Sequence, residues 1–139
     1  MSTSRKGSSI KEDMDRREFV RVPRKFRVEV QDFVFPLAQQ KPTRVECADI
    51  SAGGLRIICS RRFAEEHKVQ VKVFIPSFNK FHSGFFKVFE SDVGQYLQAV
   101  AEVAWVREAV PLTSYETGLR FVDVYEDDWL ALRKMILAS

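Results

Sequence analysis

Apolar residues alternate with polar ones along much of the chain. The clearest example is Val69, Val71, Val73 and Ile75, which are separated by single residues. A period of two is typical of a strand with one buried face, and Pro, Gly, Asn and Asp separate the apolar segments. The pattern predicts six strands, at residues 26–35, 43–51, 54–59, 69–75, 96–107 and 113–123. Because most of them follow one another without a helical segment, they indicate an all-β antiparallel sandwich or barrel.

The pattern changes at the end of the chain, where Trp129, Leu132 and Ile136 fall on one face of a helix. We therefore predict a short amphipathic C-terminal α-helix whose apolar stripe closes one end or side of the barrel. Asp127 or Asp128 can cap its first turn, where a carboxylate also meets the positive end of the helix dipole. The acidic run 126–128 is interpreted as a helix N-terminus and not as a catalytic pair.

The segment 76–95 allows two interpretations. Phe78, Phe81, Phe85 and Phe89 have helical spacing, which favours a short helix packed on the barrel, whereas a hairpin extension fits equally well. Packing is the expected role of these phenylalanines. An exposed cluster of them would instead mark a surface for a partner.

The length of 139 residues is typical of a single domain. Residues 1–14 are rich in Ser, Lys, Arg and acidic residues and contain one large aliphatic residue, Ile10. They lack the apolar area that offsets the entropy of ordering. We therefore expect a flexible N-terminal tail at residues 1–14, followed by one domain at residues 15–139.

Neither a secretory signal nor a membrane span is predicted, because no stretch approaches the ~18 to 20 apolar residues that a span needs. We expect a cytoplasmic protein in which Cys47 and Cys59 are reduced core thiols. His67 and His82 stand alone, without the partners that a metal site or a nucleophile requires. The sequence therefore argues against an enzyme, and we expect neither a metal nor a cofactor.

The formal net charge is +3, but nine basic residues oppose only four acidic ones among residues 1–27. Arg16, Arg17 and Arg21 lie just before the first predicted strand. Guanidinium groups suit phosphate and guanine, because the planar fork bonds two acceptors at once and its face stacks on a ring. The cluster indicates either an anion-binding arm or a solvated basic segment.

A second cluster occupies residues 49–54, at the junction of two predicted strands. A hairpin turn is the simplest interpretation, in which Asp49 or Ser51 bonds nearby backbone and a glycine takes positive φ. The same turn could hold a ligand. Asp49 could accept from the N1 and N2 edge of a guanine, Ser51 could add a hydroxyl, and Gly54 would let the ligand come close to the backbone.

Together the two clusters resemble the motifs of a known family. Arg17-x-x-x-Arg21 and, one predicted strand later, Asp49-x-Ser51-x-x-Gly54 are similar to the RxxxR and [D/N]xSxxG pair of PilZ domains, receptors for the bacterial second messenger cyclic di-GMP. The resemblance continues through Trp105 and through Gly-Leu-Arg-Phe at residues 118–121, and it covers residues 16 to 136. It implies a six-stranded antiparallel β-barrel with a C-terminal α-helix.

The resemblance also implies a stand-alone cyclic di-GMP receptor that performs no chemistry. Its arginines would lie on a flexible arm that folds over the ligand, and a protein partner in bacterial motility, biofilm formation or virulence would respond to the change. A basic residue such as Arg16 before the first motif arginine accompanies, in this family, two stacked ligand molecules per chain. The ligand-binding residues that we expect are Arg16, Arg17, Arg21, Asp49, Ser51, Gly53, Gly54 and Trp105.

Alternatives stay open at this point. Trp105 matches a position where some relatives place an aromatic side chain near guanine, but a core tryptophan is also possible. The chain could instead be a small barrel that binds single-stranded nucleic acid, although no exposed aromatic residues are evident beside the basic cluster. It could also be an interaction module of a motility or secretion system for which the ligand is optional. We expect no DNA or RNA partner.

Overall fold

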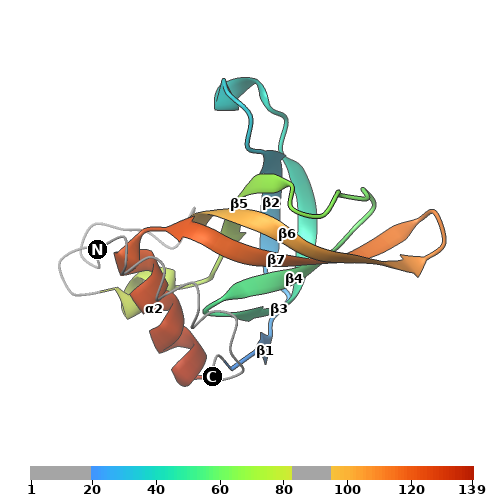
Figure 1. Ribbon diagram of the computed structural model, residues 1–139. Coiled ribbons are helices and arrows are strands. Elements are labelled where there is room, and N and C mark those ends of the chain that lie inside the picture. Colours follow the sequence, from blue (N-terminus) through green and yellow to red (C-terminus); the bar gives the residue numbers. More distant parts are fainter. Residues whose placement is uncertain (1–19, 83–94) are drawn as a thin grey trace.

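The computed structural model describes residues 20–82 and 95–139 (Figure 1). The predicted tail at residues 1–14 lies outside the described residues, and so do Arg16 and Arg17. The same holds for residues 83–94, which include Phe85 and Phe89.

Seven strands in the described part of the chain form one antiparallel sheet, which closes on itself. They pair in the order β1-β3-β2-β5-β6-β7-β4, and the additional pairing of β3 with β4 closes β2 to β7 into a six-stranded barrel. The predicted all-β barrel with a C-terminal helix is therefore confirmed. The strands are β1 (Val22–Pro23), β2 (Arg27–Asp32), β3 (Thr43–Ser51), β4 (Gly54–Cys59), β5 (Lys68–Phe74), β6 (Tyr96–Val110) and β7 (Ser114–Val124).

The predicted alternation buries one face of each strand in the barrel interior. In β5 the side chains of Val69, Val71 and Val73 are fully buried, and Leu97 and Ala101 of the neighbouring β6 face them from the same interior. Burial of these aliphatic side chains provides most of the stabilising free energy of such a fold. Cys47 and Cys59 are free thiols that are buried in this core, as predicted.

Two predicted strands differ from the observed ones by more than one residue at an end, and one short strand was not predicted. The strand predicted at residues 26–35 ends at Asp32, because the chain leaves the sheet there for a projecting connection that contains the short helix η1 (Leu37–Gln39). The strand predicted at 96–107 extends to Val110 and forms, with β7, the long hairpin that projects from the barrel in Figure 1. β1 was not predicted, since two residues are too few to show a period.

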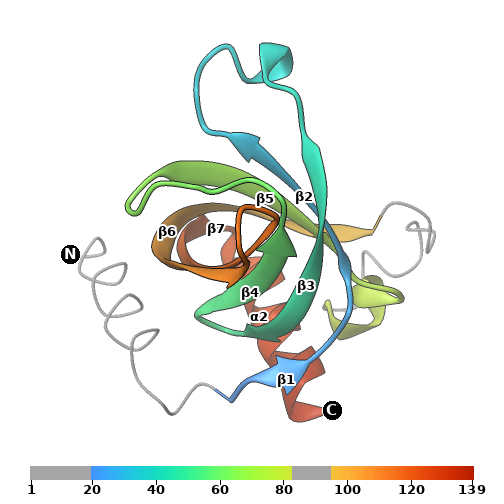
Figure 2. The same cartoon turned by 90° about the vertical axis from the view of Figure 1, so that its right-hand side faces the viewer.

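The C-terminal helix α2 (Glu126–Leu137) packs on the barrel through Ala131, Leu132, Met135 and Ile136, which are all buried. It lies on the opposite side of the molecule from the tip of the β6–β7 hairpin, as Figures 1 and 2 both show. The predicted cap is wrong. Tyr125 occupies the N-cap position without a side-chain hydrogen bond, and the helix begins at Glu126, two residues before the start that a cap at Asp127 would give. The acidic residues 126–128 instead form the first turn, where their carboxylates face the positive end of the helix dipole.

The described part of the segment 76–95 contains a short 3-10 helix, η2 (Phe78–Phe81), so a hairpin is wrong for these residues. Phe78 is buried in the core, with 2% of its surface exposed, and Phe81 packs against the same core. His82 fastens the end of η2 to the first turn of α2 through a 2.8 Å contact between its Nε2 and Oδ1 of Asp128. No helix in residues 20–82 and 95–139 is long and apolar enough to cross a membrane.

Candidate ligand-binding site

The two predicted motifs meet at the end of β3. Arg21 directly precedes β1, whose residues Val22 and Pro23 pair with Ile50 and Asp49. This pairing brings NH1 of Arg21 to 2.6 Å from Oδ1 of Asp49. The guanidinium side chain is 51% exposed and the carboxylate side chain 17%. A motif arginine and the motif carboxylate, which are 28 positions apart in the sequence, therefore form a direct ion pair.

A β-bulge turns Asp49 toward the outside of the barrel. Cys47 pairs with Ile57, but Asp49 pairs with the next residue of β4, Arg56, so that Ala48 is an extra residue in β3. Strict alternation from the buried Cys47 would point Asp49 inward. The bulge reverses this, because it lets both Cys47 and Ile50 face the core and leaves Asp49 on the outer face.

Ser51 and Gly53 have structural roles in the turn between β3 and β4. The Ser51 side chain is buried, and its Oγ accepts a hydrogen bond of 3.1 Å from the backbone N–H of Gly53. It also donates to the carbonyl of Gly54 at 3.4 Å. The Gly53 carbonyl accepts a hydrogen bond of 2.9 Å from the N–H of Phe121 on β7. The predicted hairpin turn is thus confirmed, and contacts of these two residues with a ligand stay a prediction.

Position 54 must be a glycine because the backbone of the neighbouring strand β7 lies too close for a side chain. A Cβ atom on this residue would lie 2.0 Å from the carbonyl oxygen of Leu119 in β7. The backbone that comes close to Gly54 in this structure is therefore that of β7. The approach of a ligand, which motivated the sequence prediction, is an additional role that stays a prediction.

Trp105 lies on the surface, so its interpretation as a core residue is wrong. Its exposed fraction is 38%. A second bulge is the cause: Val103 pairs with Leu119 and Trp105 with Gly118, which makes Ala104 an extra residue in β6. The indole covers Gly118, because a Cβ atom there would lie 2.2 Å from Nε1 of Trp105.

The bulges align these side chains in one row across the outer face of the barrel. Trp105 is opposite Gly118, Gly118 is opposite Arg56, and Arg56 is opposite Asp49. Directly opposite residues share a face, and adjacent strands are about 4.8 Å apart. Gly118 has no side chain, so the row presents an aromatic ring, a guanidinium and a carboxylate side by side, with Arg21 at the end.

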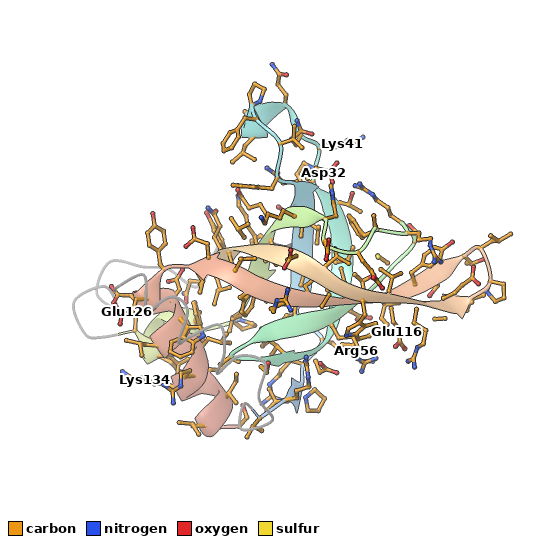
Figure 3. All side chains as sticks on the ribbon, viewed as in Figure 1. Asp32, Lys41, Arg56, Glu116, Glu126 and Lys134 are labelled. Atoms are coloured by element: carbon orange, nitrogen blue, oxygen red, sulfur yellow. The ribbon has the colours of Figure 1, made fainter. Side chains whose placement is uncertain are left out.

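Arg56 and Glu116 belong to this surface, although they were not among the predicted site residues. Nε of Arg56 donates to Oδ2 of Asp49 at 2.8 Å, and its NH1 lies 3.4 Å from Oε2 of Glu116. Figure 3 shows Arg56 and Glu116 side by side, and NH2 of Arg107 contacts the other oxygen of Glu116. The hydrogen bond to Asp49 raises the pKa of Arg56 above its usual value, although partial burial acts in the opposite direction. The sequence could have identified Arg56 as a site residue, because a two-residue turn between Ser51 and Gly54 places Asp49 opposite Arg56.

Other ionisable pairs lie away from this row. Oδ1 of Asp32 contacts Nε2 of His67 at 2.9 Å and NH2 of Arg61 at 3.0 Å. The hydrogen bond with His67 lowers the pKa of Asp32, the contacts with Arg61 lower it further, and partial burial opposes them. Among the residues that the structure describes, no three His, Cys, Asp or Glu side chains are grouped as a metal site would require.

The fold is similar to several solved structures. The Bacillus subtilis inhibitor of motility MotI (DgrA) has 17% sequence identity and a TM-score of 0.65 over 89% of this chain and 50% of that protein. MrkH from K. pneumonia, in its apo state, has 13% identity and a TM-score of 0.62 over 89% and 50%. The PilZ domain of Escherichia coli YcgR, solved with cyclic di-GMP, has 14% identity and a TM-score of 0.57 over 89% and 91%. The chain therefore spans about half the length of MotI and MrkH.

No curated protein is significantly similar in sequence. The family model described as the PilZ domain, however, matches residues 15–138, which is nearly the whole chain. This match includes both motif clusters and the row of side chains on the outer face of the barrel. The chain belongs to the PilZ domain family.

Proposed function

We propose that this protein is a receptor for cyclic di-GMP that binds the ligand between its N-terminal arm and the row from Asp49 to Trp105. The observation that carries the proposal is the contact between Arg21 and Asp49, one residue from each family motif. The family match and the YcgR PilZ domain, which was solved with cyclic di-GMP, support it.

The proposed site residues recognise different parts of the ligand, according to the chemistry of their side chains. Arg21, with Arg16 and Arg17, provides guanidinium forks for phosphate and for the O6 and N7 acceptors of guanine. Asp49 accepts from the N1 and N2 edge of a guanine, and the indole of Trp105 offers a surface beside it. Binding would draw the exposed Arg21 away from Asp49 and onto the ligand. None of these roles requires a catalytic step, and a receptor without enzymatic activity is part of the proposal.

The output of such a receptor is a changed surface that a protein partner recognises. Control of motility is the first process to test, because MotI is an inhibitor of motility with a similar fold. Biofilm formation and virulence are the other processes that the family resemblance implied. A cytoplasmic location is part of the same proposal.

The first test is isothermal titration of the full chain with cyclic di-GMP, with the linear dinucleotide and GTP as controls. Saturable binding of the cyclic ligand alone is expected. We propose two ligand molecules per chain on account of Arg16, so a ratio of one would overturn the stoichiometry but not the receptor. Absence of heat and of a thermal shift at high ligand concentration would overturn the receptor itself.

Replacing Arg21 tests the site directly. Arg21→Ala should weaken binding of cyclic di-GMP about tenfold or more, since one guanidinium contact with phosphate or guanine contributes about 1–3 kcal/mol. The fold should persist, because an exposed ion pair stabilises a protein by only about 0–1 kcal/mol. Arg24→Ala is the matched control, since Arg24 lies three residues further along and, among the residues that the structure describes, its side chain hydrogen-bonds only the carbonyl of Pro23. Normal affinity in folded Arg21→Ala protein would contradict the proposed site.

A further inference from the structure

We propose that Arg56 is a positioning residue of the ligand site, which holds the carboxylate of Asp49 in place when Arg21 turns to the ligand. This inference rests on the proposed function. It names a residue outside both family motifs and follows from the way in which Asp49 shares its two oxygens between two cations.

Arg21 and Arg56 differ in how many partners hold their side chains in place. Arg21 contacts Oδ1 of Asp49 and makes no other side-chain hydrogen bond or ion pair within residues 20–82 and 95–139. Arg56 contacts Oδ2 through Nε, and its NH1 also contacts Glu116, which is itself bound by Arg107. Arg56 is thus fixed in the barrel wall by a second carboxylate. Arg21 is free to move at the cost of one ion pair.

The charge of Asp49 explains why a second partner is needed. Its side chain is only 17% exposed, and a half-buried carboxylate that loses its sole cation is left poorly compensated. With Arg56 in place, Arg21 can transfer to a phosphate or a guanine while Asp49 stays paired. The Nε contact also fixes the orientation of the carboxylate, whose oxygens would otherwise rotate about the side chain.

The role predicts an effect on base selectivity. The carboxylate of Asp49 accepts from the N1–H and N2–H groups of guanine, and adenine lacks both donors. We expect cyclic di-AMP to bind more weakly than cyclic di-GMP, and an incorrectly oriented Asp49 should weaken binding of cyclic di-GMP while leaving that of cyclic di-AMP unchanged. A role of Arg56 in folding alone would weaken both ligands together or neither.

The experiment is titration of both cyclic dinucleotides into wild-type protein and Arg56→Gln, with Arg107→Gln as the matched control. Arg107 is the exposed outer end of the same ion network and does not touch Asp49. Arg56→Gln should lose about tenfold in affinity for cyclic di-GMP, with no change for cyclic di-AMP, because a charge-assisted hydrogen bond is lost. Arg107→Gln should stay within about twofold of wild type.

A double-mutant cycle with Asp49→Asn tests whether Arg56 acts through Asp49. Adding Arg56→Gln to Asp49→Asn should cost no more than about twofold further, since the group to be positioned has already changed. An additional tenfold loss would overturn the inference, as would unchanged selectivity in folded Arg56→Gln protein. If Arg56→Gln does not fold, Arg56→Lys replaces it in the test. One ammonium group keeps the charge but cannot hold Asp49 and Glu116 together, so selectivity should fall, but less than in Arg56→Gln. Absence of cyclic di-GMP binding by wild-type protein would instead refute the proposed function.

Discussion

Gly54 of the motif and Gly118 of the row exclude a side chain for different reasons, and the difference can be measured as a difference in stability. At Gly54 a Cβ atom would meet the backbone oxygen of Leu119, which cannot move without distorting β7. At Gly118 it would meet the indole of Trp105, a half-exposed side chain that can rotate away. Gly54→Ala should therefore lower the free energy of unfolding by about 3 kcal/mol, and Gly118→Ala by less than about 1 kcal/mol.

Urea unfolding of both variants checks these values. Gly118→Ala should also shift the tryptophan emission to longer wavelength, because Trp105 moves into solvent, whereas Gly54→Ala should not before it unfolds. A large loss of stability in Gly118→Ala without an emission change would mean that Trp105 is fixed over β7. It would then be a structural residue and a poor candidate for contact with guanine.

Whether the position of a site residue could be predicted from the sequence depends on whether neighbouring residues or a distant strand determine it. The motif residues could be identified from their spacing, and the pairing of Asp49 with Arg56 follows from the two-residue turn between them. The exposure of Trp105 could not be predicted, because alternation from the buried Val103 points it inward. Only the bulge at Ala104, which is defined against β7, reverses that direction.

At the scale of elements, a hydrogen bond connects the turn between β3 and β4 to the C-terminal helix. Nε1 of Trp129 on α2 donates to the carbonyl of Ala52 at 2.7 Å, and Ala52 is buried in the turn between β3 and β4. Trp129→Phe keeps an aromatic ring, although a smaller one, and leaves the carbonyl of the buried Ala52 without its indole donor. We expect a loss of about 2 kcal/mol in the free energy of unfolding, measured by urea denaturation.

The matched control is Arg133→Gln. The Arg133 guanidinium lies 5.0 Å from the centre of the Trp129 ring on the exposed side of the helix, so its removal should cost about 0.5 kcal/mol. Equal losses in the two variants would show that the hydrogen bond to Ala52 does not fasten the helix.

The elements themselves were largely predictable, for a physical reason. In a half-buried strand every second residue is apolar, so the strand can be identified from the sequence. The strands β3 and β4 were predicted with their observed bounds. η2 was ambiguous because four residues are too few to show either period, and its packing against α2 is a tertiary contact that the local sequence does not contain. The cap of α2 was misassigned because any of three consecutive acidic residues fits the first turn.

At the scale of the whole molecule, the closed barrel should protect its two cysteines until it unfolds. Burial raises the pKa of Cys47 to about 12, with a further contribution from nearby Asp49, and Cys59 is 7% exposed. At pH 8 the thiolate of Cys47 should be about one part in ten thousand. A thiol reagent should therefore label neither cysteine in native protein and both in concentrated urea.

The labelling rate across a urea series measures how the barrel opens. If both thiols become reactive together with the loss of circular dichroism, the barrel unfolds as one cooperative unit. Reaction of either thiol in native protein at the rate of free cysteine would contradict the closed core. Cyclic di-GMP, if it binds as proposed, should slow the labelling in proportion to its occupancy.

The sequence by itself determined the fold class, six of the strands, the C-terminal helix and the motifs of the PilZ family. These features are local, because hydrophobic period, turn residues and motif spacing are properties of neighbouring residues. The tertiary structure decided which side chains of those motifs share a surface. The outward direction of Asp49 and Trp105, and the contact of Arg21 with Asp49, depend on bulges and on the pairing of β1, and these exist only when separate strands are hydrogen-bonded to each other.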